Sequence, residues 1–261
     1  MKRIENKFKE LKHQKQKAFG VFLTAGYPSL QYSKDIFKKI IKAKADFIEI
    51  GLPFSDPMAD GPLIQHSSQI AIQQNTSVED CFEIVKDIRK ENNNIPIILM
   101  GYYNPIHYYG NLKFVKKAVS SGIDGLIIVD LPMEEDNEFY DLSFKNKLPL
   151  IRLVTPTTDE ERLKKVLKNA HGFVYYVSVT GITGTKSASV SDVKNKVKVI
   201  KKITNLPVIA GFGIKNSVDA KKMSSISDGV VIGSSLVKNI DEVYKKKNGL
   251  NEIFKFLKGF E

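Results

Sequence analysis

The sequence has few of the residues that form disulfides or bind metals. Its 261 residues include one cysteine and four histidines. The single cysteine, Cys81, excludes an intramolecular disulfide and is typical of a protein from a reducing compartment. The histidines are dispersed, and their spacing matches no familiar metal-binding motif. We therefore expect a protein without a metal site.

Long apolar runs are also missing. No run reaches the length of about eighteen residues that a membrane-spanning helix needs. Residues 1–17 are charged throughout and lack the apolar centre of a secretory signal. We expect a soluble, cytoplasmic protein that does not contact a membrane.

Arginine is scarce, although the chain is basic. Its formal net charge is +11, yet only four of the 40 basic residues are arginine. The lysines are scattered along segments with helical periodicity, whereas specific nucleic-acid sites favour clustered, arginine-rich surfaces. We interpret the lysines as a solvated coat and expect no nucleic-acid partner.

Short apolar runs alternate with amphipathic segments along the whole chain. The expected strands are at 18–24, 46–50, 95–100, 125–129, 148–154, 173–179, 207–210 and 229–232. The expected helices are at 2–13, 33–44, 64–73, 77–90, 111–120, 134–145, 159–169, 193–203 and 217–223. A loop rich in glycine, threonine and serine is expected at 180–191.

Near-continuous apolar strands between helices predict a parallel sheet that is buried on both faces. Eight such units in this length favour an α/β fold of the (β/α)8, or TIM barrel, type with an additional N-terminal helix. A doubly wound open sheet is the alternative. No linker or change in composition divides the chain, so we expect a single domain over residues 1–261.

The stretch from Ile48 to Ile64 carries the most unusual chemistry. Side-chain alternation places Glu49 on one face of a core strand, where an unpaired carboxylate is costly to bury. Three prolines and two glycines then make a shaped loop that carries Asp56 and Asp60. From these residues alone, a salt-bridged core acid followed by ordinary turn residues remains an equal alternative to a catalytic site.

Two glycine-containing loops resemble a phosphate cradle. Gly211-Phe212-Gly213 and Gly233-Ser234-Ser235 follow the last two predicted strands, where barrels commonly bind phosphate. Thr183-Gly184, after the sixth strand, supplies a possible third edge. Each motif is weak alone, but their shared position favours a phosphorylated substrate.

The remaining residues narrow the chemistry further. No predicted strand contains an interior lysine for Schiff-base chemistry, and no His/Asp/Glu cluster suits a metal-assisted aldol reaction. Acid–base catalysis by carboxylates, without a cofactor, is what remains. Apolar residues at the strand ends suggest a flat, possibly aromatic, substrate group; they are Phe22, Met100, Ile127, Val129, Leu153, Tyr175 and Phe212.

Six motifs together resemble one known family over essentially the whole chain. They are the stretch Ile48 to Ile64, Thr24-Ala-Gly-Tyr-Pro28, Gly101-Tyr-Tyr-Asn-Pro105, Asp130-Leu-Pro132, Thr180-Gly-Ile-Thr-Gly184 and Gly211-Phe-Gly213. The sequence is similar to the tryptophan synthase alpha chain. This resemblance implies a lyase of tryptophan biosynthesis, which cleaves indole-3-glycerol phosphate to indole and glyceraldehyde 3-phosphate by a retro-aldol reaction.

The resemblance also implies roles for single residues. Glu49 would be the general acid/base, and Asp60 would accept the indole N–H and stabilise the protonated ring. The residues expected to bind or enclose the substrate are Phe22, Met100, Ile127, Tyr175, Thr183 and Phe212. Those expected to bind the phosphate are Gly184, Gly213, Gly233 and Ser234.

A partner follows from the same resemblance. A beta chain that carries pyridoxal phosphate would receive the indole within a heterotetramer of two alpha and two beta chains, and this chain would need no cofactor of its own. The residues expected to contact the beta chain are Pro53, Asp56, Pro57, Asn104 and Pro105.

Two other kinds of function remain open at this point. A different phosphate-binding barrel enzyme, such as a sugar-phosphate isomerase, would use the same cradle. A non-catalytic activator of a beta chain, or a basic nucleic-acid binder, is a third interpretation. The presence of both Glu49 and Asp60 argues against a purely activating role.

Overall fold

The computed structural model describes residues 2–177, 179–180, 186–187, 189–211 and 213–260. Within these residues, eight parallel strands form one sheet in the order β4-β3-β2-β1-β10-β9-β6-β5. The strands are β1 (Ala18–Thr24), β2 (Phe47–Gly51), β3 (Ile97–Gly101), β4 (Gly125–Ile128), β5 (Arg152–Val154), β6 (Val174–Val177), β9 (Val208–Gly211) and β10 (Gly229–Ile232). A parallel bridge between Leu126 and Leu150 joins β4 to the segment that precedes β5. The sheet therefore closes into the expected barrel.

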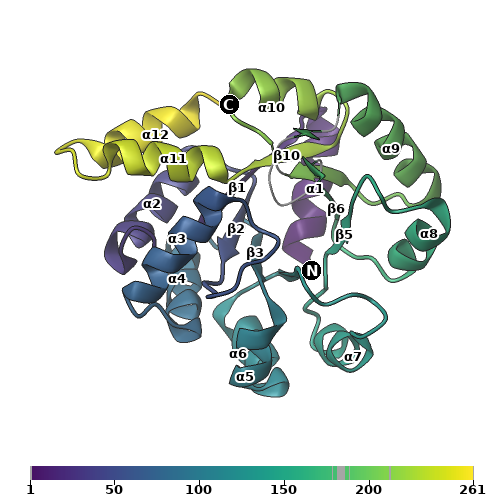
Figure 1. Ribbon diagram of the computed structural model, residues 1–261, viewed down its shortest axis with the longest axis horizontal. Helices are drawn as coiled ribbons and strands as arrows, with labels where there is room; N and C mark the ends of the chain where they lie inside the picture. The colour runs from purple at the N-terminus through teal and green to yellow at the C-terminus, as the bar shows by residue number, and fades with distance from the viewer. Residues whose placement is uncertain (1, 178, 181–185, 188, 212, 261) are drawn as a thin grey trace.

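Helices surround the barrel on its outer side (Figure 1). They are α2 (Leu30–Lys42), α3 (Pro62–Gln73), α4 (Val78–Glu91), α5 (Tyr103–Tyr109), α6 (Asn111–Ser121), α7 (Asn137–Lys145), α8 (Glu160–Lys168), α9 (Val190–Ile203), α10 (Ser217–Ser224), α11 (Ser234–Val243) and α12 (Gly249–Lys258). Several begin at a side-chain cap; α4, for example, starts with a reciprocal capping box between Ser77 and Asp80. Single-domain organisation over residues 1–261 stays a prediction.

Three local expectations were wrong. The strand expected at 148–154 is regular only from Arg152: Pro149 has no N–H to extend the ladder backwards, and the segment before Arg152 pairs with β4 through the bridge at Leu150. No helix was expected between residues 91 and 110, yet the segment that contains Asn104 and Pro105 forms α5, since proline is tolerated in the first turn of a helix. The expected loop at 180–191 contains part of a short antiparallel pair, β7 (Val179–Thr180) with β8 (Lys186–Ser187), and α9 already begins at Val190.

The N-terminal helix α1 (Lys2–Gln14) is present as expected and packs against the barrel. Figure 1 shows it in the centre of the ring of helices. Ile4 is fully buried, and the ring of Phe8 lies 6.3 Å from that of Phe47 and 5.7 Å from that of Phe173. Phe47 opens β2 and Phe173 directly precedes β6, so α1 covers the end of the barrel where the strands begin.

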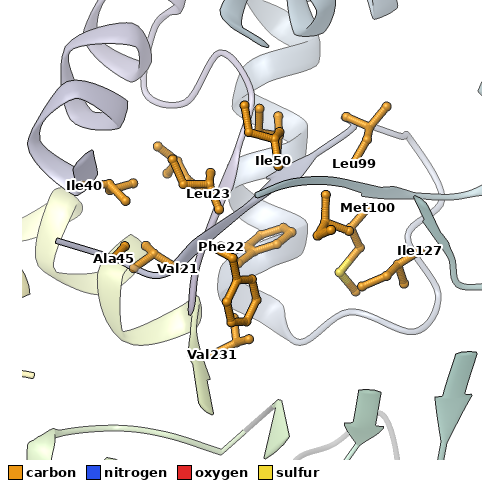
Figure 2. Packing of buried hydrophobic residues seen from close by; sticks show 14 of the residues in the cluster. Val21, Phe22, Leu23, Ile40, Ala45, Ile50, Leu99, Met100, Ile127 and Val231 are labelled. Atoms are coloured by element: carbon orange, nitrogen blue, oxygen red, sulfur yellow. The ribbon is translucent and has the colours of Figure 1, made fainter. Parts of the chain in front are cut away.

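The two faces of the strands pack against different neighbours (Figure 2). Leu23, Ile50 and Leu99 lie on one side of the strands, while Phe22 and Met100 lie on the other. This is the alternation that a strand imposes on successive side chains. It places Phe22 and Met100 in the barrel interior, at the end where the strands finish.

Candidate active site

Glu49 lies in the interior of the barrel, in the middle of β2. It is level with Phe22 of β1 and Ile98 of β3, so it shares the inward face with Phe22, as alternation predicted. Its side chain is fully buried, and neither carboxyl oxygen has a hydrogen-bond partner among the residues that the structure describes. Burial raises the pKa of Glu49 to about 8. The salt-bridged alternative therefore does not apply within the described residues, and Glu49 holds a proton near neutral pH.

Tyr175 stands beside this carboxyl group. Burial raises the pKa of Tyr175 well above its usual value, and the charges of Glu49 and Asp60 raise it further. Its side chain packs tightly on β9, where a Cβ added to Gly211 would lie only 2.1 Å from the Tyr175 hydroxyl oxygen. Glycine at that position thus gives the ring its space inside the barrel.

Asp60 lies on the loop between β2 and α3. Gln65 donates a hydrogen bond to the Asp60 carbonyl at 2.9 Å, and the Ala59 N–H donates to the Tyr102 hydroxyl at 3.0 Å. Burial raises the pKa of Asp60 to about 6, and a hydrogen bond with Tyr102 partly opposes this shift. Asp60 is thus mostly ionised near neutral pH, whereas Glu49 is mostly protonated. Two carboxyl groups in different environments can divide the roles of acid and anion between them.

A cavity of about 710 Å³ opens at the carboxyl ends of the strands. Its walls include the predicted residues Phe22, Asp60, Met100, Tyr175, Gly213, Gly233 and Ser234. Ile127 is fully buried and is not part of the cavity wall; Figure 2 shows it beside Met100. Thr183, Gly184 and Phe212 lie outside the described residues. The structure therefore brings Asp60 and predicted aromatic and glycine residues to one cavity, whereas Glu49 is not part of the cavity wall and lies level with Phe22, which is.

The cavity has one end suited to an anion. Gly213 has a φ of +80°, a conformation that favours glycine. Gly233 ends the turn after β10 and is the N-cap of α11, and it offers no side chain to bond the first N–H groups of that helix. Ser234 opens the helix. Free N–H groups at a helix start, together with the helix dipole, favour a bound phosphate.

Sequence reasoning missed several residues of the cavity wall. Lys215 and Lys238 line it, together with Ile214 and Val231. Both lysines were included in the solvated coat, because lysine spacing alone does not distinguish a cavity wall from an open surface. Their proximity to Gly213 and Gly233 in the sequence is the one signal that pointed to them.

The expected partner residues lie on two segments that meet at the same end of the barrel. Pro53, Asp56 and Pro57 are on the β2–α3 loop, and Asn104 and Pro105 are in α5. The Phe54 ring on the first segment lies 5.3 Å from that of Tyr102, which directly precedes α5. Two large side chains beside them are exposed, Met58 at 68% and Tyr108 at 93%.

Two further searches covered the described part of the chain. None of its helices combines the length and the hydropathy that crossing a membrane would require. Its histidine, cysteine and acidic side chains nowhere form a group of three able to hold a metal ion. Cys81 is buried in α4.

Comparisons with known proteins agree on one family. A sequence model described as "Tryptophan synthase alpha chain" matches residues 8–261. The tryptophan synthase alpha chain of Geotalea daltonii is 47% identical over 247 residues, which are 95% of this chain and 93% of that protein.

Solved structures are similar over nearly the full length. The crystal structure of tryptophan synthase subunit alpha from Legionella pneumophila str. Paris aligns with a TM-score of 0.91 at 34% identity, over 99% of this chain and 96% of that chain. An aminoacrylate-bound tryptophan synthase from M. tuberculosis contains a chain that aligns with a TM-score of 0.88 at 27% identity, over 99% and 97% of the two chains.

Proposed function

This chain belongs to the tryptophan synthase alpha chain family, and we propose that Glu49 and Asp60 are the catalytic residues of its reaction. The reaction is the lyase step of tryptophan biosynthesis, which cleaves indole-3-glycerol phosphate to indole and glyceraldehyde 3-phosphate. The indole then passes to a beta chain for tryptophan synthesis. The observation that carries our assignment is the fully buried Glu49 carboxyl group, which is unpaired among the described residues and lies level with Phe22 of the cavity wall.

The proton transfers follow from the two different pKa values. Glu49 begins protonated and donates its proton to C3 of the indole, which puts positive charge on the ring. The ionised Asp60 accepts the indole N–H and stabilises that charge. Glu49, now a carboxylate, removes the proton from the hydroxyl group on the adjacent side-chain carbon. The carbon–carbon bond breaks, its electron pair returns to the ring, and the hydroxyl carbon becomes an aldehyde.

Positioning of the substrate is the task of the remaining wall residues. Phe22, Met100 and Tyr175 offer an apolar surface to the indole, and Ile127 packs beside Met100. The N–H groups at Gly213, Gly233 and Ser234 bind the phosphate, and Gly184 completes this cradle. Thr183 and Phe212 close the site around the substrate. Holding both ends of the substrate fixes the reacting carbon relative to Glu49.

The complex with the beta chain is also part of the proposal. We propose that Pro53, Asp56, Pro57, Asn104 and Pro105 contact the beta chain in a heterotetramer of two alpha and two beta chains. In this family pyridoxal phosphate is carried by the beta chain, and the acid–base chemistry above needs no cofactor in this chain. Because Asp60 and Asp56 share one loop, docking would order the catalytic anion. We place the assembly in the cytoplasm.

Indole release from indole-3-glycerol phosphate tests the assignment. We would measure it with the purified chain, alone and with a beta chain, for the wild type, Glu49→Gln and Asp60→Asn. Loss of a general acid/base is expected to lower kcat by about 100-fold or more, and loss of the anion by about 10-fold or more. The exposed Glu91 offers a matched control, since Glu91→Gln removes a carboxylate at the end of α4 without touching the cavity.

The outcomes separate the alternatives. Normal indole release by Glu49→Gln would overturn the assignment of the acid/base. No indole from the folded wild type, combined with turnover of an aldose or ketose phosphate, would indicate the isomerase instead.

A further inference from the structure

Two side chains at the carboxyl ends of β3 and β4 have no role in the reaction as described above. Tyr102 follows β3, is 3% exposed and is not part of the large cavity wall. Asp130 opens the motif Asp130-Leu-Pro132 after β4. The Val129 N–H donates to the Gly101 carbonyl at 2.9 Å, so the chain segments that carry Asp130 and Tyr102 leave the barrel side by side.

The hydroxyl group of Tyr102 contacts the loop that carries Asp60. Its oxygen accepts a hydrogen bond from the Ala59 N–H at 3.0 Å, and Ala59 directly precedes Asp60. The Tyr102 ring lies 5.3 Å from that of Phe54, near the start of the same loop. Because the oxygen already accepts from Ala59, the hydroxyl proton is free for the Asp60 carboxylate, with which Tyr102 shares a second, small cavity. One side chain therefore holds both the backbone before Asp60 and its carboxylate.

Tyr102 remains a hydrogen-bond donor near neutral pH. Burial, and after it the charge of Asp60, raises the pKa of Tyr102 well above its usual value. The phenol therefore keeps its proton, and its hydrogen bond lowers the pKa of Asp60 against the larger effect of burial. This bond favours the ionised form of Asp60, which the proposed reaction needs.

Asp130 fixes the start of α5, where Tyr102 lies. Tyr102 is the N-cap of this helix, but its side chain makes no capping hydrogen bond. The Asp130 carboxylate accepts from the Tyr103 N–H at 2.7 Å instead, so the cap comes from the loop after the neighbouring strand. The helix dipole favours a negative charge at this end. The Asp130-Leu-Pro132 motif thus holds the backbone on which Tyr102 is mounted.

We propose that Tyr102 is a positioning residue for Asp60, and that Asp130 holds Tyr102 in place for this task. Tyr102 acts through the acid, since its hydroxyl orients the Asp60 carboxylate while its own side chain stays outside the large cavity. A displacement of about 1 Å in a reacting group can cost about 100-fold in rate, so an acid on a loop needs such support. The inference rests on the proposed function and deepens it, because Asp60 is the anion of that reaction.

Tyr102→Phe tests the proposal, because it removes the hydroxyl group and keeps the ring. We expect kcat for indole release to fall by about 5- to 20-fold. The acid limb of the kcat/KM profile should move to higher pH, because Asp60 loses a bond that favours its ionised form. The other titratable groups near Asp60, which are Glu49, Tyr175 and the two lysines of the cavity wall, are unchanged.

Tyr103→Phe is the matched control. It removes the hydroxyl group of the next residue, which accepts from the Asn111 side chain at 2.8 Å and does not contact the Asp60 loop. This variant should keep both kcat and the acid limb of the wild type. Circular dichroism and thermal unfolding confirm that each variant is folded.

A double-variant cycle separates positioning from a general loss of structure. If Tyr102 acts through Asp60, Tyr102→Phe should change the residual activity of Asp60→Asn by less than about twofold. Asp130→Ala should lower kcat by about 2- to 5-fold in the wild type and add less than about twofold in Tyr102→Phe, whereas Asp130→Asn keeps an acceptor for the cap. Losses that multiply fully in either pair would contradict the proposal.

A titration of the carboxyl groups by NMR observes Asp60 without reference to activity. Its ¹³C signal, assigned by its absence in Asp60→Asn, should titrate at higher pH in Tyr102→Phe than in the wild type and in Tyr103→Phe. An Asp60 titration that does not move in folded Tyr102→Phe would overturn the role of Tyr102. A titration that moves in a protein that makes no indole would support that role and overturn the catalytic assignment instead.

Discussion

A carboxyl group that is buried without a partner reduces the stability of a fold, and Glu49 is such a group within the described part of the chain. The neighbouring acid, Asp60, lies at the cavity wall with a smaller shift in pKa. Because their environments differ, Glu49 is suited to donate a proton and Asp60 to act as an anion. Both predictions at the scale of single residues follow from their titration.

The pH dependence of kcat/KM is the first prediction. The proposed reaction needs protonated Glu49 and ionised Asp60, whose pKa values are raised to about 8 and about 6. Activity is therefore expected to be highest between these values and to fall about tenfold per pH unit outside them. The measurement is kcat/KM for indole release by the chain without a beta chain.

The acid limb of this profile needs a control, because a substrate phosphate also titrates near about pH 6. In Asp60→Asn, the part of the acid limb that comes from Asp60 should disappear from the pH profile of the residual activity. The part that comes from the substrate phosphate should remain. An alkaline limb that does not appear below about pH 9.5 would contradict the role of Glu49 as the initial proton donor.

The second prediction concerns stability. The pKa of Glu49 is about 8 in the folded chain against an ordinary value of 4.5. Between these values the unfolded chain releases a proton that the folded chain keeps, so stability decreases as pH rises through this window. Glu49→Gln does not titrate, and at about pH 8 it should exceed the wild type by at least about 2 kcal/mol, or roughly 4–8 °C in Tm.

Thermal unfolding of both proteins at about pH 5 and about pH 8 checks this difference. The sign is the informative part, because a variant that loses activity while it gains stability identifies a residue retained for function. Equal pH dependence in the two proteins would show that Glu49 is ionised in the folded state.

At the scale of elements, the loop between β2 and α3 decides where Asp60 lies. Ser68 of α3 holds this loop with two hydrogen bonds: it accepts from the Phe54 N–H at 2.8 Å and donates to the Phe54 carbonyl at 2.9 Å. Ser68 is 4% exposed. The loop is therefore attached to a rigid helix close to the acid that it carries.

Ser68→Ala is predicted to lower kcat by about 3- to 10-fold, because a loosened loop presents Asp60 in the wrong place for part of the time. Loss of stability should stay near about 1–2 kcal/mol. Ser120→Ala is the matched control, since that exposed hydroxyl bonds only its own helix, at Lys117. If docking orders the same loop, addition of a beta chain should recover part of the rate lost in Ser68→Ala. An unchanged kcat in Ser68→Ala without a beta chain would mean that Ser68 does not position Asp60.

The elements also show how far the sequence alone can go. The inward position of Glu49 was predictable because strand alternation is local, and the barrel was predictable because eight strand–helix units leave few other arrangements. Helix α5 was missed because Asn104 and Pro105 are typical of turns as well as of first helical turns.

The cavity wall was harder to predict. Lys215 and Lys238 have the same local chemistry as the other lysines, and only the packing of two distant segments brings them to one cavity. Ile127 was placed at the substrate because it lies at a strand end; it is fully buried and does not line the cavity, whereas its neighbour Met100 does. Local patterns fix which face a side chain takes, while depth within the barrel depends on neighbours from other strands.

At the scale of the whole molecule, the barrel separates catalysis from stability. The cavity opens where the strands end, and α1 covers the opposite end. Asp124, directly before β4, connects three segments at that covered end. Its carboxylate pairs with Arg3 of α1 at 3.0 Å and with Arg89 of α4 at 2.6 Å, and it accepts from the Ile97 N–H at 3.0 Å.

The last prediction is therefore a variant that weakens the fold and spares the reaction. Asp124→Asn leaves the largely buried Arg89 guanidinium, 10% exposed, without its counter-charge. Breaking a buried pair in this way costs about 3–5 kcal/mol. We expect a clear fall in the midpoint of urea unfolding, with kcat and KM for indole release unchanged at low temperature, where the variant remains folded.

The control variant Glu134→Gln breaks the exposed pair with Arg162 and should cost no more than about 1 kcal/mol of stability. A tenfold loss of activity in folded Asp124→Asn would show that the two ends of the barrel are coupled.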